Sequence, residues 1–151
     1  MSILGSATIY ERDNFIYVCP QNETTLGLWL GAPPYERLAI NASDDGLGGT
    51  VLSALARSER GVPHPTRNSL DDVRPLLRLA GVRSLRAFER GAKLVLAQLG
   101  DDSLVIVPGR SLEPRHHGYG MQKDVAIRLS SWDAGVVGRA IRDALAIATV
   151  S

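Results

Sequence analysis

Short runs in which apolar and polar residues alternate open the chain, and this pattern predicts β-strands. Residues 7–11 and 15–19 have it, and residues 12–14 between them, which include an aspartate and an asparagine, are typical of a tight turn. We therefore expect a hairpin here. Pro20 should end the second strand, because proline cannot donate a hydrogen bond to a neighbouring strand. A further strand-like run at 37–40 leads into a polar cluster.

That polar cluster is a predicted helix start. Asn41 or Ser43 can accept hydrogen bonds from the first free amides, and the aspartates that follow suit the positive end of the helix dipole. The apolar stripe of this helix comprises Leu47, Val51, Leu52 and Leu55.

Two more helices are expected. In the first, Ser69 and Asp72 have the spacing of a capping box and Gly81 suits the end, whereas Pro75 means that the helix is either kinked or starts later. The last helix follows Ser130 and Asp133, which again have capping-box spacing. Its apolar stripe comprises Val137, Ile141, Ala144, Leu145 and Ala148.

The region between these two helices predicts a meander of strands at 84–89, 93–99 and 103–107. The central run is apolar almost throughout, which is typical of a strand covered on both faces. Pro108 and Gly109 should end the third strand. Residues 57–68 and 110–122 are interpreted as loops, and alternation at 124–129 predicts one more strand.

Two segments share one plan of an apolar strand, a polar cap, a glycine and an amphipathic helix. Shifting the first, LAINASDDGLGGTVLSALARS, by 90 residues superposes Gly48 on Gly138 and residues 54–56 on 144–146. Either the two segments are a duplicated strand–helix unit, or they are similar only because any capped amphipathic helix that follows a strand has this pattern. The patterns together predict one domain over residues 1–151, of the α/β or α+β class. It should have a central mixed or antiparallel sheet and about three packed helices.

Composition excludes several classes of protein. The 151 residues are 44% hydrophobic and 22% charged, near the globular average. A net charge of +1 gives no global attraction to nucleic acid or to an anionic membrane. The single cysteine, Cys19, rules out an internal disulfide and is interpreted as a small buried hydrophobe rather than a nucleophile. With no export signal and no long apolar stretch, a cytoplasmic location is expected.

The histidines are the first candidates for chemistry. His116 and His117 cannot both bind one ion from a regular strand, since neighbouring side chains point to opposite faces, and metal-ligand spacings are missing. We therefore expect no metal and no cofactor. His64, with His116 or His117 and Lys123, supplies the residue types of an acid–base site for RNA cleavage. A small ribonuclease-like hydrolase stays open as an alternative.

The densest basic stretch has acidic residues among its arginines, so we interpret it as a solvated face rather than a nucleic-acid groove. It comprises Arg74, Arg78, Arg83, Arg86 and Arg90.

Residues 37–58 and 123–148 resemble stretches of immunity proteins of contact-dependent growth inhibition systems, the CdiI type. In those proteins an apolar strand leads into a Ser-rich acidic cap, a glycine and an Ala/Leu helix. The matching residues of the later segment are Ser130, Ser131, Asp133, Gly138, Ala140, Ala144 and Leu145. The earlier segment matches at Ser43, Asp44, Asp45, Leu47, Gly48, Val51, Leu55 and Ser58.

The resemblance implies a cytosolic, non-enzymatic protein that binds and neutralises the C-terminal toxin domain, often a nuclease, of a CdiA-type effector. It implies no direct contact with nucleic acid or membrane. Interfaces favour charged and aromatic anchors. The candidate toxin-binding residues are Asp101, Asp102, Arg110, Glu113, Arg115, His116, His117 and Tyr119. An adaptor or oligomerisation module without a toxin partner is a further alternative.

Overall fold

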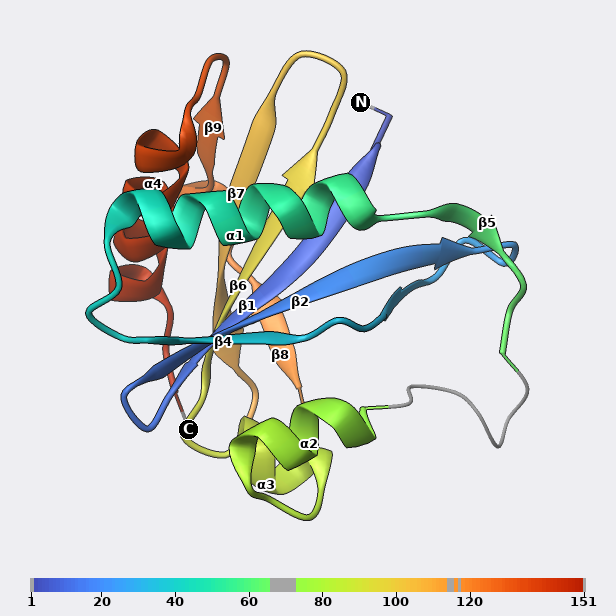
Figure 1. The fold of residues 1–151 in the computed structure, drawn as a ribbon, viewed down its shortest axis with the longest axis vertical. Helices are drawn as coiled ribbons and strands as arrows, with labels where there is room; N and C mark the ends of the chain where they lie inside the picture. Colours follow the sequence, from blue (N-terminus) through green and yellow to red (C-terminus); the bar gives the residue numbers. More distant parts are fainter. Residues whose placement is uncertain (1, 66–72, 114–115, 117, 151) are drawn as a thin grey trace.

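A computed structural model describes residues 2–65, 73–113, 116 and 118–150 of the chain (Figure 1). Within these residues nine strands form one sheet of an α+β fold, with four α-helices and a short 3-10 helix. The strands are β1 Gly5–Arg12, β2 Phe15–Thr24, β3 Trp29–Gly31, β4 Glu36–Ala39, β5 Arg60–Val62, β6 Lys93–Leu99, β7 Leu104–Ser111, β8 Tyr119–Met121 and β9 Ile127–Leu129. The helices are α1 Asp44–Arg57, α2 Arg74–Ala80, α3 Leu85–Glu89, η1 Lys123–Val125 and α4 Ala134–Ile147. The predicted fold class is confirmed.

The sheet consists of two halves with the same plan. In the first half β1 and β2 form a hairpin, and the outer side of β2 pairs with β4 near its start and with β3 near its end. In the second half β6, β7, β9 and β8 repeat this arrangement. Antiparallel pairing of β1 with β6 joins the halves. Each half ends in a 14-residue helix, and α1 and α4 are 90 residues apart. The similarity between the two strand–helix segments of the sequence is therefore part of a structural repeat.

The predicted first hairpin is confirmed, and its turn explains the sequence there. Asp13 and Asn14 both have positive φ angles, 50° and 67°, as a two-residue type I′ turn requires. Aspartate and asparagine tolerate this backbone better than other residues with a side chain.

Both predicted strand ends at proline are wrong, and for the same reason. β2 continues through Pro20 and β7 through Pro108. The carbonyl of Pro20 accepts from Ala32 N at 2.8 Å and that of Pro108 from Gln122 N at 2.9 Å. The N and the carbonyl of one strand residue point to the same side, so each proline presents its missing N–H away from the central strands. The pairing of β1 with β2 and of β6 with β7 is therefore unaffected.

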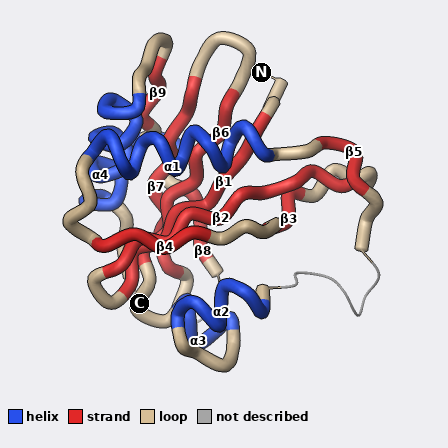
Figure 2. The backbone as a smooth tube through the Cα atoms, in the orientation of Figure 1, coloured by secondary structure: helices blue, strands red, loops and turns tan. Residues whose placement is uncertain are grey.

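One face of the sheet packs against α1 and α4, and we call it the α1–α4 face. Alternate residues of the central strands, such as Ala7 and Ile9 of β1 and Val95 and Ala97 of β6, point to this side and are fully buried. With residues of both helices they form a cluster of 18 buried aliphatic side chains. Figure 2 shows the helices gathered in two groups, α1 with α4 and α2 with α3.

Glycine allows α1 and α4 to touch backbone to backbone. A Cβ atom at Gly48 would lie 1.6 Å from the carbonyl oxygen of Ala134, and one at Gly138 would lie 2.0 Å from that of Asp44. Because Ala134 is the counterpart of Asp44 in the repeat, the contact is made twice in the same way. Ser43 caps α1 by accepting from Gly46 N at 3.0 Å.

The cap of α4 differs from the prediction. Asp133, not Ser130, is its N-cap, and its carboxylate accepts from Val136 N at 2.9 Å. The short strand β5 and the strand β8 lie in segments that we interpreted as loops. The predicted strand at 124–129 is shorter, since η1 occupies its first part.

The opposite face of the sheet is covered by α2 and α3 (Figure 1). Its buried residues are fewer and largely aromatic, and they comprise Tyr17, Cys19, Tyr35, Leu76 and Phe88. The rings of Tyr10 and Tyr17 meet Phe88 edge-on at 5.0 and 5.2 Å between centroids.

Two predictions for this region have different outcomes. α2 starts at Arg74 with Pro75 in its first turn and ends at Gly81 with φ 70°, so the later start and the glycine end are confirmed. The proposed cap by Ser69 and Asp72 lies outside the described residues. The predicted strand at 84–89 is wrong: Ser84 accepts from Ala87 N at 3.1 Å and starts the short helix α3.

Candidate interaction surface

The predicted toxin-binding residues lie at the two ends of β7. Asp101 and Asp102 are exposed in the turn before β7, whereas Arg110 is exposed near its end. Arg110 lies eight residues beyond Asp102 along nearly extended chain, which corresponds to about 26 Å. The two aspartates therefore do not share a patch with the rest of the predicted residues.

The remaining predicted residues follow β7 toward β8. Glu113 is half-buried, His116 is exposed and Tyr119 is half-buried on β8. Arg115 and His117 lie outside the described residues. The structure thus brings Arg110, Glu113, His116 and Tyr119 to the end of the sheet where β7 ends and β8 begins.

Tyr119 and Glu113 tie this segment to α3. The Tyr119 hydroxyl lies 3.1 Å from the carbonyl oxygen of Glu89 and 2.8 Å from that of Ala92, to which it can donate. Burial, and then the nearby Glu89 and Glu113 carboxylates, raise the pKa of Tyr119, so it stays protonated as a donor. The Arg86 guanidinium lies 3.9 Å from the Glu113 carboxylate. The hydroxyl of Tyr119 therefore serves the fold, and Tyr119 and Glu113 connect β8 and the end of β7 to α3.

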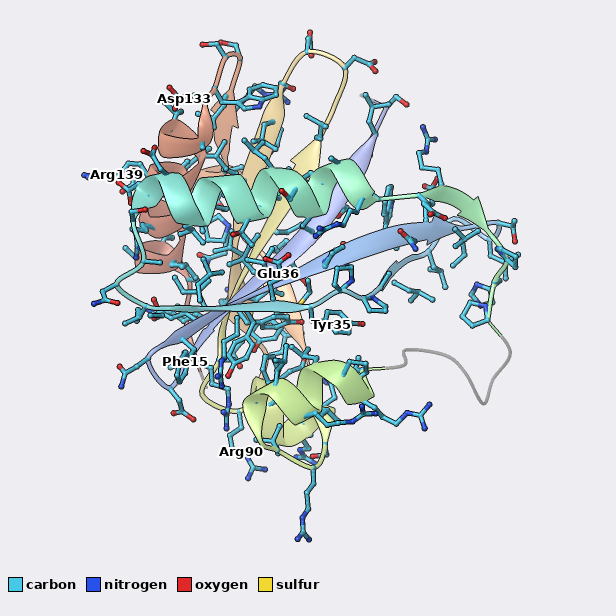
Figure 3. All side chains as sticks on the ribbon, viewed as in Figure 1. Phe15, Tyr35, Glu36, Arg90, Asp133 and Arg139 are labelled. Carbon is cyan, nitrogen blue, oxygen red and sulfur yellow. The ribbon has the colours of Figure 1, made fainter. Side chains whose placement is uncertain are left out.

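Exposed arginines are the main charged residues of the segment that contains α2 and α3. We call this group the arginine cap; it comprises Arg74, Arg78, Arg83, Arg86 and Arg90. Figure 3 labels Arg90 beside α3. Among the described residues, Arg78, Arg83 and Arg90 have no hydrogen-bond or ion-pair partner for their side chains. The exposure of all five arginines agrees with the interpretation of this stretch as a solvated face.

A sixth arginine connects α2 to the sheet. Arg37 on β4 lies over the Phe15 ring at 4.3 Å from its centroid, and its Nη1 donates to the carbonyl oxygen of Leu79 at 3.1 Å. The cap is thereby attached to the first half of the sheet as well as to the β7–β8 segment.

A pocket of about 200 Å³ lies between the opposite face of the sheet and α2. Its walls include Thr8, Cys19, Gln21, Trp29, Tyr35 and Leu76. Cys19 is 2% exposed, and burial raises the pKa of its thiol to about 12. At neutral pH the thiol is therefore protonated, which suits the predicted role of a small buried hydrophobe.

The histidines of the hydrolase alternative lie at opposite corners of the sheet. His64 follows β5, which pairs with the end of β2, and its Nδ1 lies 3.0 Å from Thr24 Oγ1. His116 follows β7, and β7 runs antiparallel to β2 with β1 and β6 between them. Among the described residues, none of the hydrogen bonds or ion pairs joins His64, His116 and Lys123. No three His, Cys, Asp or Glu side chains in this part of the chain are grouped to hold a metal ion.

None of the described helices combines the length and the apolar character that spanning a membrane requires.

Known structures share this fold along almost the whole chain. A protein of unknown function from Neisseria meningitidis, NMB0488, is 18% identical and matches with a TM-score of 0.79 over 99% of both chains. A chain of the CdiA-CT/CdiI toxin and immunity complex from Yersinia pseudotuberculosis is 20% identical and has a TM-score of 0.77. That match covers 96% of this chain and 98% of the other. No model of a known protein family and no curated protein matches the sequence.

Proposed function

We propose that this protein is an immunity protein that binds and neutralises the C-terminal toxin domain of a contact-dependent growth inhibition effector. The observation that carries the proposal is the end-to-end likeness of its fold to a chain of the CdiA-CT/CdiI complex. The sequence resemblance of residues 37–58 and 123–148 to CdiI-type proteins supports the immunity side of such a complex over the toxin side.

Neutralisation by binding needs a surface rather than reacting groups. A specific interface typically covers about 800 Å² on each partner, with charged and aromatic anchors near its centre. The arginine cap, together with the exposed Arg110 and His116, supplies charged side chains for such a surface. The resembling segments β4–α1 and β9–α4 build the opposite side of the protein and serve as scaffold.

The finer parts of the proposal concern the partner and the place of action. The partner is the toxin domain of the cognate CdiA-type effector, and nuclease activity is the expected class of toxin. Complex formation takes place in the cytoplasm of the producing cell, before the toxin reaches its target.

Coexpression with the toxin domain encoded beside this chain tests the proposal. Cells that make the toxin domain should grow when this protein is present, and the two purified proteins should form a stoichiometric complex by size-exclusion chromatography. The toxin domain of the Yersinia pseudotuberculosis complex serves as the unmatched control, because immunity proteins discriminate among toxins by unfavourable as well as favourable contacts. Absence of both protection and binding would refute the proposal.

The hydrolase alternative makes a separate prediction. Purified protein would then cleave RNA, and His64→Ala or His116→Ala would abolish cleavage. The position of these residues at opposite corners of the sheet favours the binding function.

A further inference from the structure

The near-neutral net charge hides an uneven distribution. Residues 73–92, which contain α2 and α3, hold five arginines and one glutamate. The rest of the chain holds 12 basic and 15 acidic residues, so it is net negative. The positive charge is therefore concentrated in one short segment.

This segment has two distinct sides. Leu76 and Phe88 are 3% and 0% exposed and pack against the sheet, while the five arginines are exposed to solvent. Arg74 and Arg78 are four residues apart on α2, and Arg86 and Arg90 are four residues apart at α3. Arg78, Arg83 and Arg90 have no side-chain partner among the described residues, so their charge is available to a partner of opposite charge.

The arginine cap also lies outside the structural repeat. α2 and α3 come between the two halves of the chain, and the second half has no described counterpart of them. The buried core of the repeat does not include their side chains. Their arginines are therefore not explained by the packing of the scaffold.

We propose that the arginine cap is the part of the surface that docks onto an acidic face of the toxin domain. This inference rests on the proposed function and specifies the chemistry of the partner: clustered carboxylates that the planar guanidinium groups can bind in pairs. Arg110 and His116 extend the same surface beyond α3, since the Arg86–Glu113 contact connects the two regions.

A compact acidic protein face fits this surface better than nucleic acid does. The one aromatic residue in 73–92, Phe88, is fully buried, so the cap offers no ring on which a base could stack. An extended polyanion would also run from the cap onto the net negative remainder of the protein.

Reversing charge in the cap tests the inference. The variant carries Arg78→Glu, Arg83→Glu and Arg90→Glu, because these side chains have no partner among the described residues. We expect binding to the purified toxin domain to weaken at least about tenfold at about 50 mM salt, largely through a slower association rate. The wild-type affinity should fall with added salt, and that dependence should be smaller in the variant.

The matched control makes the same change in net charge elsewhere. Arg57→Glu, Arg60→Glu and Arg139→Glu alter exposed residues of α1, β5 and α4. This control should bind within about threefold of wild type, because screening limits the effect of distant charges. Circular dichroism and thermal melting should show that both variants are folded.

The outcomes separate this inference from the proposed function. If the wild type binds and protects while the cap variant does so equally well, the docking surface is elsewhere and only the inference fails. If the cap variant instead loses affinity for RNA and keeps its affinity for the toxin domain, the cap is a nucleic-acid site and the inference is again overturned. If the wild type neither binds nor protects, the proposed function fails and the inference fails with it.

Discussion

The two faces of the sheet are built in different ways. On the α1–α4 face, 18 aliphatic residues are buried and two helices meet backbone to backbone at glycines. On the opposite face, five residues are buried where α2 and α3 pack, beside a pocket of about 200 Å³, and five exposed arginines lie in the same segment. Close packing makes the first face sensitive to every added atom. The second face buries fewer residues and borders a pocket, so substitutions of the exposed arginines beside it should disturb the packing little.

Enlarging a side chain at the contact between α1 and α4 should have the largest effect on stability. Gly48→Leu places a side chain where even a Cβ would overlap the Ala134 carbonyl, so we expect a loss of about 4 kcal/mol or more, enough to prevent folding. Urea unfolding followed by circular dichroism measures the loss. Gly49→Ala is the control: a Cβ there meets no atom within 4 Å, and alanine should stabilise α1 by up to about 1 kcal/mol. Equal effects of the two changes would contradict the close contact.

Removing the central ring of the other face should have the next largest effect. Phe88→Ala deletes a fully buried side chain that two tyrosine rings contact, and we expect a cost of about 3 kcal/mol. Hydrogen exchange should show the loss of protection in α2 and α3 before α1 and α4. The exposed neighbour Arg90→Ala should change stability by less than about 0.5 kcal/mol. Simultaneous loss of protection in all four helices would show that the faces are not separable.

Replacing a charged side chain on the α1–α4 face should have a smaller effect on stability. Arg142 on α4 binds the Asp44 carboxylate at 2.9 Å and donates to the carbonyl oxygens of Ile40, at 2.9 Å, and Ala42. Arg142→Met should therefore cost about 2 kcal/mol by loosening the segment before α1. Arg139→Met, on the same helix, removes only an exposed ion pair with Asp143 and should cost less than about 0.5 kcal/mol. Chemical denaturation of both variants provides the comparison, which would fail if the two costs were equal.

The smallest expected effect is a loss of stability at alkaline pH, which arises from Cys19 on the opposite face of the sheet. Burial raises the pKa of Cys19 from 9.0 to about 12, so between these values the unfolded chain loses a proton that the folded chain keeps. Stability from this thiol is complete below pH 9 and falls as the pH rises toward 12. Unfolding measured from pH 8 to 11 should show this decline, and Cys19→Ala should make it shallower. Burial also raises the pKa of Tyr10, so part of the slope should remain in the variant. An unchanged slope would refute the assignment to Cys19.

The local pattern of apolar and polar residues predicted the long helices and the first hairpin well, but it predicted the strand ends and the short helix α3 poorly. The α4 stripe and the first hairpin could be predicted because their periodicity and turn residues are local signals. The continuation of strands through Pro20 and Pro108 could not, because it depends on which side each residue presents to its neighbours. Ser84 has the chemistry of a helix cap, but the following helix has only five residues and no clear period.

The candidate surface was predicted only in part. Arg110, Glu113, His116 and Tyr119 are neighbours in sequence and remain together in the fold, whereas the aspartates before β7 lie at its other end. The exposure of the arginine cap agrees with its interpretation as a solvated face, whereas which residues of α2 and α3 are buried against the sheet could be seen only in the fold. Whether these residues bind a toxin stays a prediction.

The place of α2 and α3 between the two halves has an evolutionary consequence. Each half ends in its own helix, and these helices lock the halves together on the far side of the sheet. Changes on the outer side of α2 and α3 therefore leave the shared architecture intact. Substitutions can accumulate at these positions while the scaffold is inherited unchanged, so the exposed residues there and the fold can diverge at different rates.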